Sequence, residues 1–167
     1  MLVQASDVIN PLMMMNSEPL QAVPRTKKKP RVLLIDDDLD MGEIVKNSLK
    51  FRYNCRVDIA SDPFEAMNTM TENFYDLIIL DWRLPALNGG QTLKELEKGF
   101  YFEPALPIQW DKQRVPVIVF SAGEKNQCTL ERTKHFDCVG FISKRQPLNA
   151  IVEAFGAHIV AANEKNY

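Results

Sequence analysis

Short apolar runs alternate along the chain with segments whose apolar residues recur at helical spacing. The apolar runs, four to six residues long, are nearly continuous in three cases, which is typical of parallel strands buried on both faces. The predicted strands are residues 32–35, 56–60, 77–80, 115–120 and 140–143. The predicted helical segments are residues 41–49, 63–70, 93–96, 125–136 and 148–159, of which 125–136 is the weakest.

This alternation predicts the class of fold. Five strand and helix units with buried parallel strands imply right-handed crossovers between neighbouring strands. We therefore expect an α/β protein, a three-layer α/β/α sandwich around a five-stranded parallel sheet.

The composition is that of one ordinary globular domain. The chain has 167 residues, 46% of them apolar, with a formal net charge of −2. This balance does not favour nucleic acid or a membrane surface as the main partner, and no apolar stretch approaches the length of a membrane span. The cysteines, Cys55, Cys128 and Cys138, are odd in number and lack metal-ligand spacing, which favours a reducing cytoplasm.

The first part of the chain, residues 1–30, reads as a flexible leader before a domain at 31–167. Asp7 and Glu18 interrupt it and it has no sustained apolar core, so it does not resemble a secretory signal. It ends in a short basic linker between Pro24 and Pro30. A solvated leader is favoured over a docking or nucleic-acid tail, because the charge run is short.

One stretch, residues 99–114, does not fit a compact pattern. It contains Pro104, Pro107 and the aromatic residues Tyr101, Phe102 and Trp110. A loop this long is uncommon in a compact domain and often has a specific role. A surface insertion that packs on its own side chains is the alternative.

Polar residues follow four of the predicted strands directly. They are Asp36 and Asp37 after the first strand, Asp81 after the third, Ser121 after the fourth and Lys144 after the fifth. The carboxyl ends of parallel strands converge on one crevice. Three carboxylates there repel one another and need a proton or a cation. Mg²⁺, which prefers oxygen ligands, suits them.

These residue types fit the transfer of a phosphoryl group. An aspartate such as Asp81 can attack phosphorus and form an acyl phosphate. Ser121 can donate a hydrogen bond and Lys144 can place a positive charge near the incoming oxygens. Asp38 and Asp40 are better read as helix-start residues than as metal ligands.

Four stretches of the chain resemble the receiver domain of two-component response regulators, in particular the single-domain chemotaxis type. They are residues 33–38, 75–89, 116–122 and 140–144, in the same order as in that family. The segment around Asp81, with Leu84-Pro85 and Asn88-Gly89 at the expected offsets, is the most specific. The resemblance implies a flavodoxin-like sheet with strand order 2-1-3-4-5.

The resemblance also implies a role for each residue of the site. Asp81 would be the phosphoacceptor, Asp36 and Asp37 the acidic pair that binds Mg²⁺ with Asp81 and the backbone carbonyl of Arg83, Lys144 the phosphate-contacting lysine, Ser121 the switch hydroxyl and Phe141 the switch aromatic.

Three features depart from the family pattern. The family usually has proline directly after its lysine, whereas Arg145 follows Lys144 here. The 99–114 loop is longer than usual. Arg83 places a cation beside the acceptor, where it could stabilise the phosphorylated state or obstruct water, so we predict slow self-hydrolysis.

The function predicted from these observations is a cytoplasmic phosphorylation switch. It would accept a phosphoryl group on Asp81 from a histidine kinase or histidine phosphotransfer protein, with Mg²⁺-dependent self-phosphorylation and self-dephosphorylation and no other enzymatic activity. The output surface would be residues 125–136, the strand 140–143 and the final helix. Few residues follow that helix, so we expect no DNA-binding domain and output through a protein partner or a phosphorelay.

Two alternatives belong to other classes. A phosphorylation-independent adaptor would keep the fold and bind partners constitutively, and Arg145 and the long loop leave room for it. A Mg²⁺-dependent phosphatase of the haloacid-dehalogenase type would use an aspartyl intermediate. Such enzymes generally carry a second aspartate two positions after the nucleophile, where this chain has Arg83.

Overall fold

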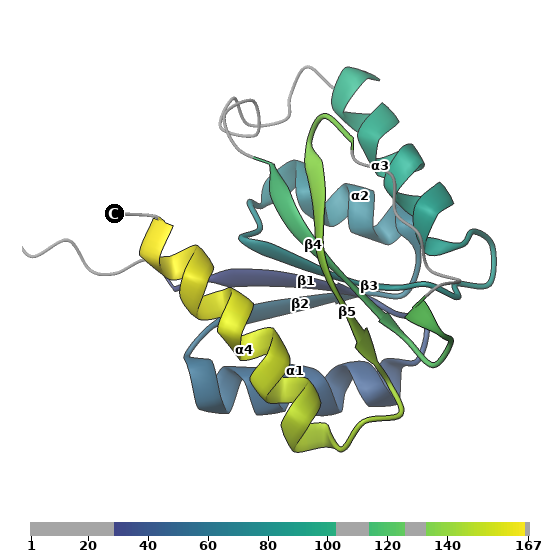
Figure 1. Cartoon of the computed structure of the whole chain (residues 1–167). Helices are drawn as coiled ribbons and strands as arrows, with labels where there is room; N and C mark the ends of the chain where they lie inside the picture. Colours follow the sequence, from purple (N-terminus) through teal and green to yellow (C-terminus); the bar gives the residue numbers. More distant parts are fainter. Residues whose placement is uncertain (1–28, 103–113, 126–132, 166–167) are drawn as a thin grey trace, which may run out of the picture.

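A five-stranded parallel sheet with strand order β2-β1-β3-β4-β5 lies between two layers of helices (Figure 1). The computed structural model describes residues 29–102, 114–125 and 133–165. The strands are β1 (Arg31–Ile35), β2 (Arg56–Ala60), β3 (Leu77–Asp81), β4 (Val115–Ser121) and β5 (Phe136–Ser143). The helices in this part of the chain are α1 (Leu39–Tyr53), α2 (Pro63–Glu72), α3 (Gly89–Phe102) and α4 (Leu148–Lys165). The predicted fold and strand order are confirmed.

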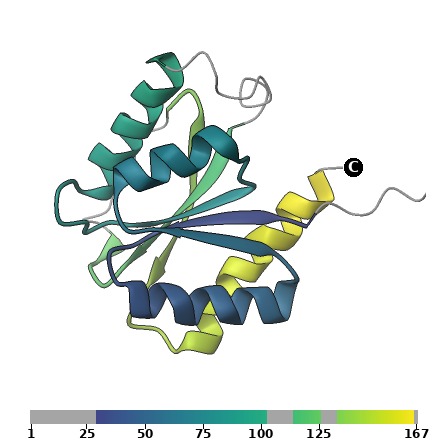
Figure 2. The same cartoon turned by 180° about the vertical axis from the view of Figure 1, so that it is seen from behind.

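The two faces of the sheet carry separate apolar cores. Helices α1 and α4 cover one face, and α2 and α3 cover the other (Figures 1 and 2). Successive residues of a strand point to opposite faces, so in β1 Leu34 belongs to the core under α1 and α4, and Leu33 to the core under α2 and α3. Both are fully buried, which is why the sequence of this strand is apolar without interruption.

Aspartates begin two of the helices at the carboxyl edge of the sheet. Asp38 Oδ1 accepts a hydrogen bond from Met41 N at 3.0 Å, so Asp38 caps α1 as predicted. Asp62 Oδ1 accepts hydrogen bonds from the backbone N–H groups of Phe64 (2.8 Å) and Glu65 (2.9 Å). These caps satisfy N–H groups that have no partner inside the helix. They also fix the turns that follow β1 and β2.

The fifth strand differs from the prediction. It begins at Phe136, whereas the sequence predicted residues 125–136 as helical and the strand only from 140. Phe136 pairs in register with Val115 and is buried, and Thr133 Oγ1 accepts a hydrogen bond from its N–H at 2.9 Å. The prediction failed because polar and small residues interrupt the apolar run at the start of this edge strand.

The long predicted loop also begins later than expected. Helix α3 continues to Phe102, so the backbone of residues 99–102 is helical. Three predicted segments lie outside the described residues: the remainder of that loop (103–113), most of the helical segment (126–132) and the leader up to residue 28.

Two further observations concern the whole described part. None of its helices is both long and apolar enough to cross a lipid bilayer. Cys55 and Cys138 are free thiols, the first buried and the second exposed.

Candidate functional site

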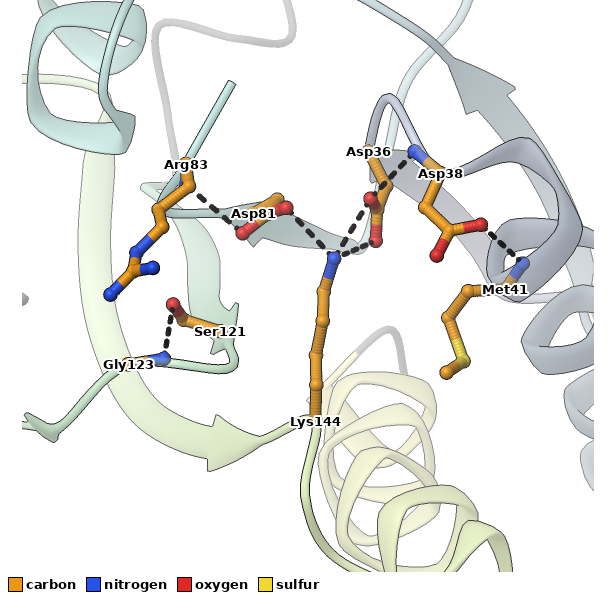
Figure 3. Close-up of polar contacts among 8 residues, drawn as sticks. All are labelled: Asp36, Asp38, Met41, Asp81, Arg83, Ser121, Gly123 and Lys144. Carbon is orange, nitrogen blue, oxygen red and sulfur yellow. Dashed lines mark hydrogen bonds and ion pairs between the residues drawn. The ribbon is translucent and has the colours of Figure 1, made fainter. Parts of the chain in front are cut away.

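The ammonium group of Lys144 joins carboxylates from two other strands. Lys144 Nζ lies 2.9 Å from Asp36 Oδ1 and 2.7 Å from Asp36 Oδ2, and 2.8 Å from Asp81 Oδ2. Figure 3 shows the lysine reaching from the end of β5 to both aspartates, which follow or end β1 and β3. The predicted convergence of these three residues on one edge of the sheet is therefore observed.

Asp36 is fully buried at the end of β1. Its backbone N–H donates to Ala60 O at 3.0 Å, which ties this turn to β2. Its Oδ1 accepts hydrogen bonds from Lys144 and from Asp38 N, the latter at 3.1 Å. Its Oδ2 contacts the ammonium without hydrogen-bond geometry and accepts no hydrogen bond from the described residues. Burial raises the pKa of this carboxyl, although Lys144 acts to lower it.

Lys144 remains a cation in this environment. Burial by itself lowers the pKa of the lysine, but the hydrogen bonds and charges of Asp36 and Asp81 outweigh it, and the pKa is raised. The site thus holds a fixed positive charge at neutral pH, next to two carboxylates.

The strand-end residues Asp36, Asp81 and Ser121 share one local geometry. In each case a side-chain oxygen accepts a hydrogen bond from the backbone N–H two residues later. The donors are Asp38 N to Asp36 Oδ1 (3.1 Å), Arg83 N to Asp81 Oδ1 (3.0 Å) and Gly123 N to Ser121 Oγ (3.1 Å). Such turns orient each side chain over the edge of the sheet. These bonds were not predicted from the sequence, although Asp and Ser side chains commonly accept hydrogen bonds from nearby backbone N–H groups.

Ser121 is the last residue of β4 and is fully buried. It lies between the other strands of the site, because Phe120 beside it pairs with Asp81 of β3 and Ser121 itself pairs with Ser143 of β5. Its carbonyl oxygen accepts a hydrogen bond from Lys144 N at 2.9 Å. Ser121 is thus at the predicted edge, with its hydroxyl bonded to the loop that follows (Figure 3).

Three carboxylates form a group that fits a divalent cation. One oxygen each from Asp36, Asp37 and Asp81 lies within 4.8 Å of the others. Asp37 is exposed, and Asp36 Oδ2 offers a buried oxygen that accepts no hydrogen bond from the described residues. When ionised, the three carboxylates carry a charge of −3 and Lys144 carries +1. A divalent cation would neutralise the remaining charge of −2. An all-oxygen donor set is what Mg²⁺ prefers, so the residues present fit the predicted ion.

Arg83 and Phe141 are placed by the structure, but their predicted roles are not tested by it. The Arg83 side chain is exposed and extends on the far side of Asp81 from Lys144 (Figure 3). Its backbone carbonyl as a metal ligand stays a prediction. Phe141 is half-buried in β5, in register with Val119, and its movement as a switch likewise stays a prediction.

The loop after Lys144 closes without the proline that the resemblance implied. Arg145 N donates to Ser143 Oγ at 3.2 Å, and Gln146 N donates to Ser143 O at 3.2 Å. The described residues contain no cis peptide bond. Ser143 therefore provides the turn that carries the chain from β5 to α4.

Comparison with known proteins identifies the family of this chain. The family model described as "Response regulator receiver domain" matches residues 32–156. The "Transcriptional regulatory protein CpxR homolog" of Haemophilus influenzae is 37% identical over 68 residues, which are 41% of this chain and 29% of that protein. The chain thus spans less than a third of that relative.

Solved receiver domains have the same fold. The non-phosphorylated HemR receiver domain from Leptospira biflexa is 28% identical, with a TM-score of 0.58, and the match covers 78% of this chain and 94% of that one. The signal receiver domain of a putative Luxo repressor protein from Vibrio parahaemolyticus gives a TM-score of 0.60 at 20% identity, covering 83% and 96%.

The chain therefore belongs to the receiver domains of response regulators. This membership rules against the phosphatase alternative and agrees with a part in two-component signalling.

Proposed function

We propose that the protein is a phosphorylation switch in which Asp81 accepts a phosphoryl group from a histidine of a partner protein. The observation that supports this most directly is the contact of Lys144 with both Asp81 and Asp36 at one buried edge of the sheet. The family match over residues 32–156 agrees with it.

In the proposed reaction, a carboxylate oxygen of Asp81 attacks the phosphorus atom. The bond from phosphorus to the imidazole nitrogen of the donor breaks, and its electron pair stays on that nitrogen. Lys144 neutralises charge on the equatorial oxygens of the transferring group. Mg²⁺, held by Asp36, Asp37, Asp81 and the Arg83 carbonyl, would supply further charge stabilisation. Attack of water on phosphorus later releases phosphate and restores the carboxylate.

Phosphorylation would then change the surface around β5. Ser121 Oγ would exchange its bond with Gly123 N for one with a phosphoryl oxygen, and Phe141 would turn inward into the vacated space. The output face would comprise residues 125–136, β5 and α4. Exposed apolar residues Val139, Leu148 and Val160 on β5 and α4 support a protein partner for this face.

We also propose that the protein works in the cytoplasm, with a histidine kinase or histidine phosphotransfer protein as its donor. The free thiols of Cys55 and Cys138 are consistent with a reducing compartment.

The proposal can be tested with a phosphoryl mimic and Trp82, whose ring packs against Gly89 and Gly90 just after the acceptor. A Trp110→Phe background leaves Trp82 as the only tryptophan. We expect beryllofluoride with Mg²⁺ to change its fluorescence, and Asp81→Asn to abolish the change. Asp40→Asn, an exposed carboxylate in the first turn of α1, is the matched control and should respond fully. No response in any variant would favour the constitutive adaptor.

A further inference from the structure

The aromatic ring of Phe120 lies beneath the Lys144 ammonium. Lys144 Nζ is 5.2 Å from the centroid of this ring, within the distance at which a cation is attracted to an aromatic face. Phe120 is fully buried. It pairs in register with Asp81 on one side and with Ile142 on the other, so it lies on β4 between the strands that carry the acceptor and the lysine.

A second aromatic residue holds this ring in place. The centroids of Phe120 and Phe155 are 5.2 Å apart with an interplanar angle of 77°. This is the edge-to-face arrangement that aromatic pairs prefer. Phe155 is fully buried on α4, so the orientation of Phe120 is fixed from the helix that packs on the sheet.

The contact with the Phe120 ring leaves one N–H of the Lys144 ammonium available for another acceptor. An ammonium group has three N–H donors, and the hydrogen bonds to Asp36 Oδ1 and Asp81 Oδ2 account for two of them. The Lys144 side chain is only 14% exposed, so its charge has lost much of its hydration. An aromatic face attracts that charge without offering an oxygen or nitrogen that would claim the third N–H.

We propose that Phe120 is a positioning residue. Its ring holds the Lys144 ammonium within hydrogen-bonding distance of Asp36 and Asp81, with one N–H directed to an incoming phosphoryl oxygen. The part that concerns the phosphoryl group rests on the proposed function. The contact between the ring and the ammonium does not.

Fluorinated phenylalanines at position 120 test this, because fluorine weakens the negative face of the ring with little change in size. With Mg²⁺ and acetyl phosphate, the rate constant for phosphorylation should fall stepwise with fluorination, by roughly three- to tenfold over the series. The same series at Phe136, which is equally buried but belongs to the core on the other face of the sheet, is the control and should show no trend. A rate that does not follow fluorination at 120 would overturn the proposal.

Stability gives a readout that does not depend on phosphorylation. Fluorination at 120 should lower the urea midpoint in the otherwise unchanged protein and lower it much less in a Lys144→Met background, because the cation is then absent. If the unchanged protein takes up no phosphoryl group, the proposed function fails, and this cycle still decides whether Phe120 holds Lys144. Equal shifts in the two backgrounds would overturn the proposal.

Discussion

Lys144 Nζ lies 2.8 Å from Asp81 Oδ2, although the two residues are 63 positions apart in the chain. The sheet produces this contact. Strand β4 lies between β3 and β5, and its register with each of them brings the carboxyl ends of β3 and β5 to the same edge of the sheet. Lys144 N also donates to Ser121 O, the last residue of β4. The site is therefore built on strand ends, which are more rigid than long loops.

Mg²⁺ should stabilise the folded protein. The three carboxylates would hold the ion only while the fold brings them together, so unfolding would release it. At a Mg²⁺ concentration of 100 times the Kd, stabilisation is about 2.7 kcal/mol, or roughly 5–10 °C in Tm for a domain of this size. Differential scanning calorimetry with Asp37→Asn should show a much smaller shift, while Asp40→Asn should keep it. Equal shifts in the two variants would argue against the proposed ligands.

Asp36→Asn should become more stable relative to the unchanged protein as the pH rises. Burial raises the pKa of this carboxyl, so the folded state binds its proton more tightly than the unfolded state. The contribution of Asp36 to stability is thus favourable at low pH and is lost as the pH rises above the ordinary aspartate pKa of about 3.9. The pKa of Lys144 is also raised, but that contribution is lost only at alkaline pH, above the usual lysine value.

Urea denaturation between about pH 3.5 and 7 without divalent ions measures this difference. Lys144 keeps Asp81 as a partner in the Asp36→Asn variant, so the ammonium is not left alone. If the difference in free energy of unfolding between Asp36→Asn and the unchanged protein stays constant over this pH range, the raised pKa of Asp36 is contradicted.

Arg83→Ala should speed the loss of phosphate from Asp81. We expect a rate increase of roughly three- to tenfold, equivalent to about 1 kcal/mol in barrier, because the exposed guanidinium beside the acceptor obstructs water or stabilises the phosphorylated state. Phosphate release after removal of the donor is the measurement. Arg145→Ala removes another exposed cation of the same edge and serves as control. An unchanged rate in Arg83→Ala would refute the assigned role.

Gly156→Ala should destabilise the packing of α4 on α1. A methyl group at this buried position would overlap the ring of Tyr53, and such overpacking costs roughly 1–3 kcal/mol. Gly140→Ala is the matched control, since the nearest atom, His158 Nε2, would lie 3.7 Å from the added carbon. Urea midpoints of the two variants test this. A Gly156→Ala protein as stable as the Gly140→Ala protein would show that Tyr53 moves aside without loss.

Strands buried on both faces were the most predictable part of the fold. Residues 77–80 were predicted as a strand and β3 spans Leu77–Asp81. The four positions before Asp81 are fully buried and therefore demand apolar residues. The half-exposed start of β5 was missed, since Asp137 and Cys138 give no periodic apolar signal.

The site was predictable in its residues but not in its bonds. Asp36, Asp81, Ser121 and Lys144 stand where the strands end, and the structure brings them to one edge, while their roles in phosphoryl transfer stay predictions. The position of Phe120 under the ammonium could not be predicted. It depends on the register of β4 against β5, which shifts between Val117 and Ile118.

The central claim is that Asp81 is the phosphoryl acceptor, and intact-mass spectrometry tests it most directly. The full chain is incubated with Mg²⁺ and acetyl phosphate, alongside the Asp81→Asn and Asp40→Asn variants. We predict one added phosphoryl group on the unchanged protein and on Asp40→Asn, and none on Asp81→Asn. An unchanged protein that gains no mass, or an Asp81→Asn protein that gains the same mass, would contradict the account.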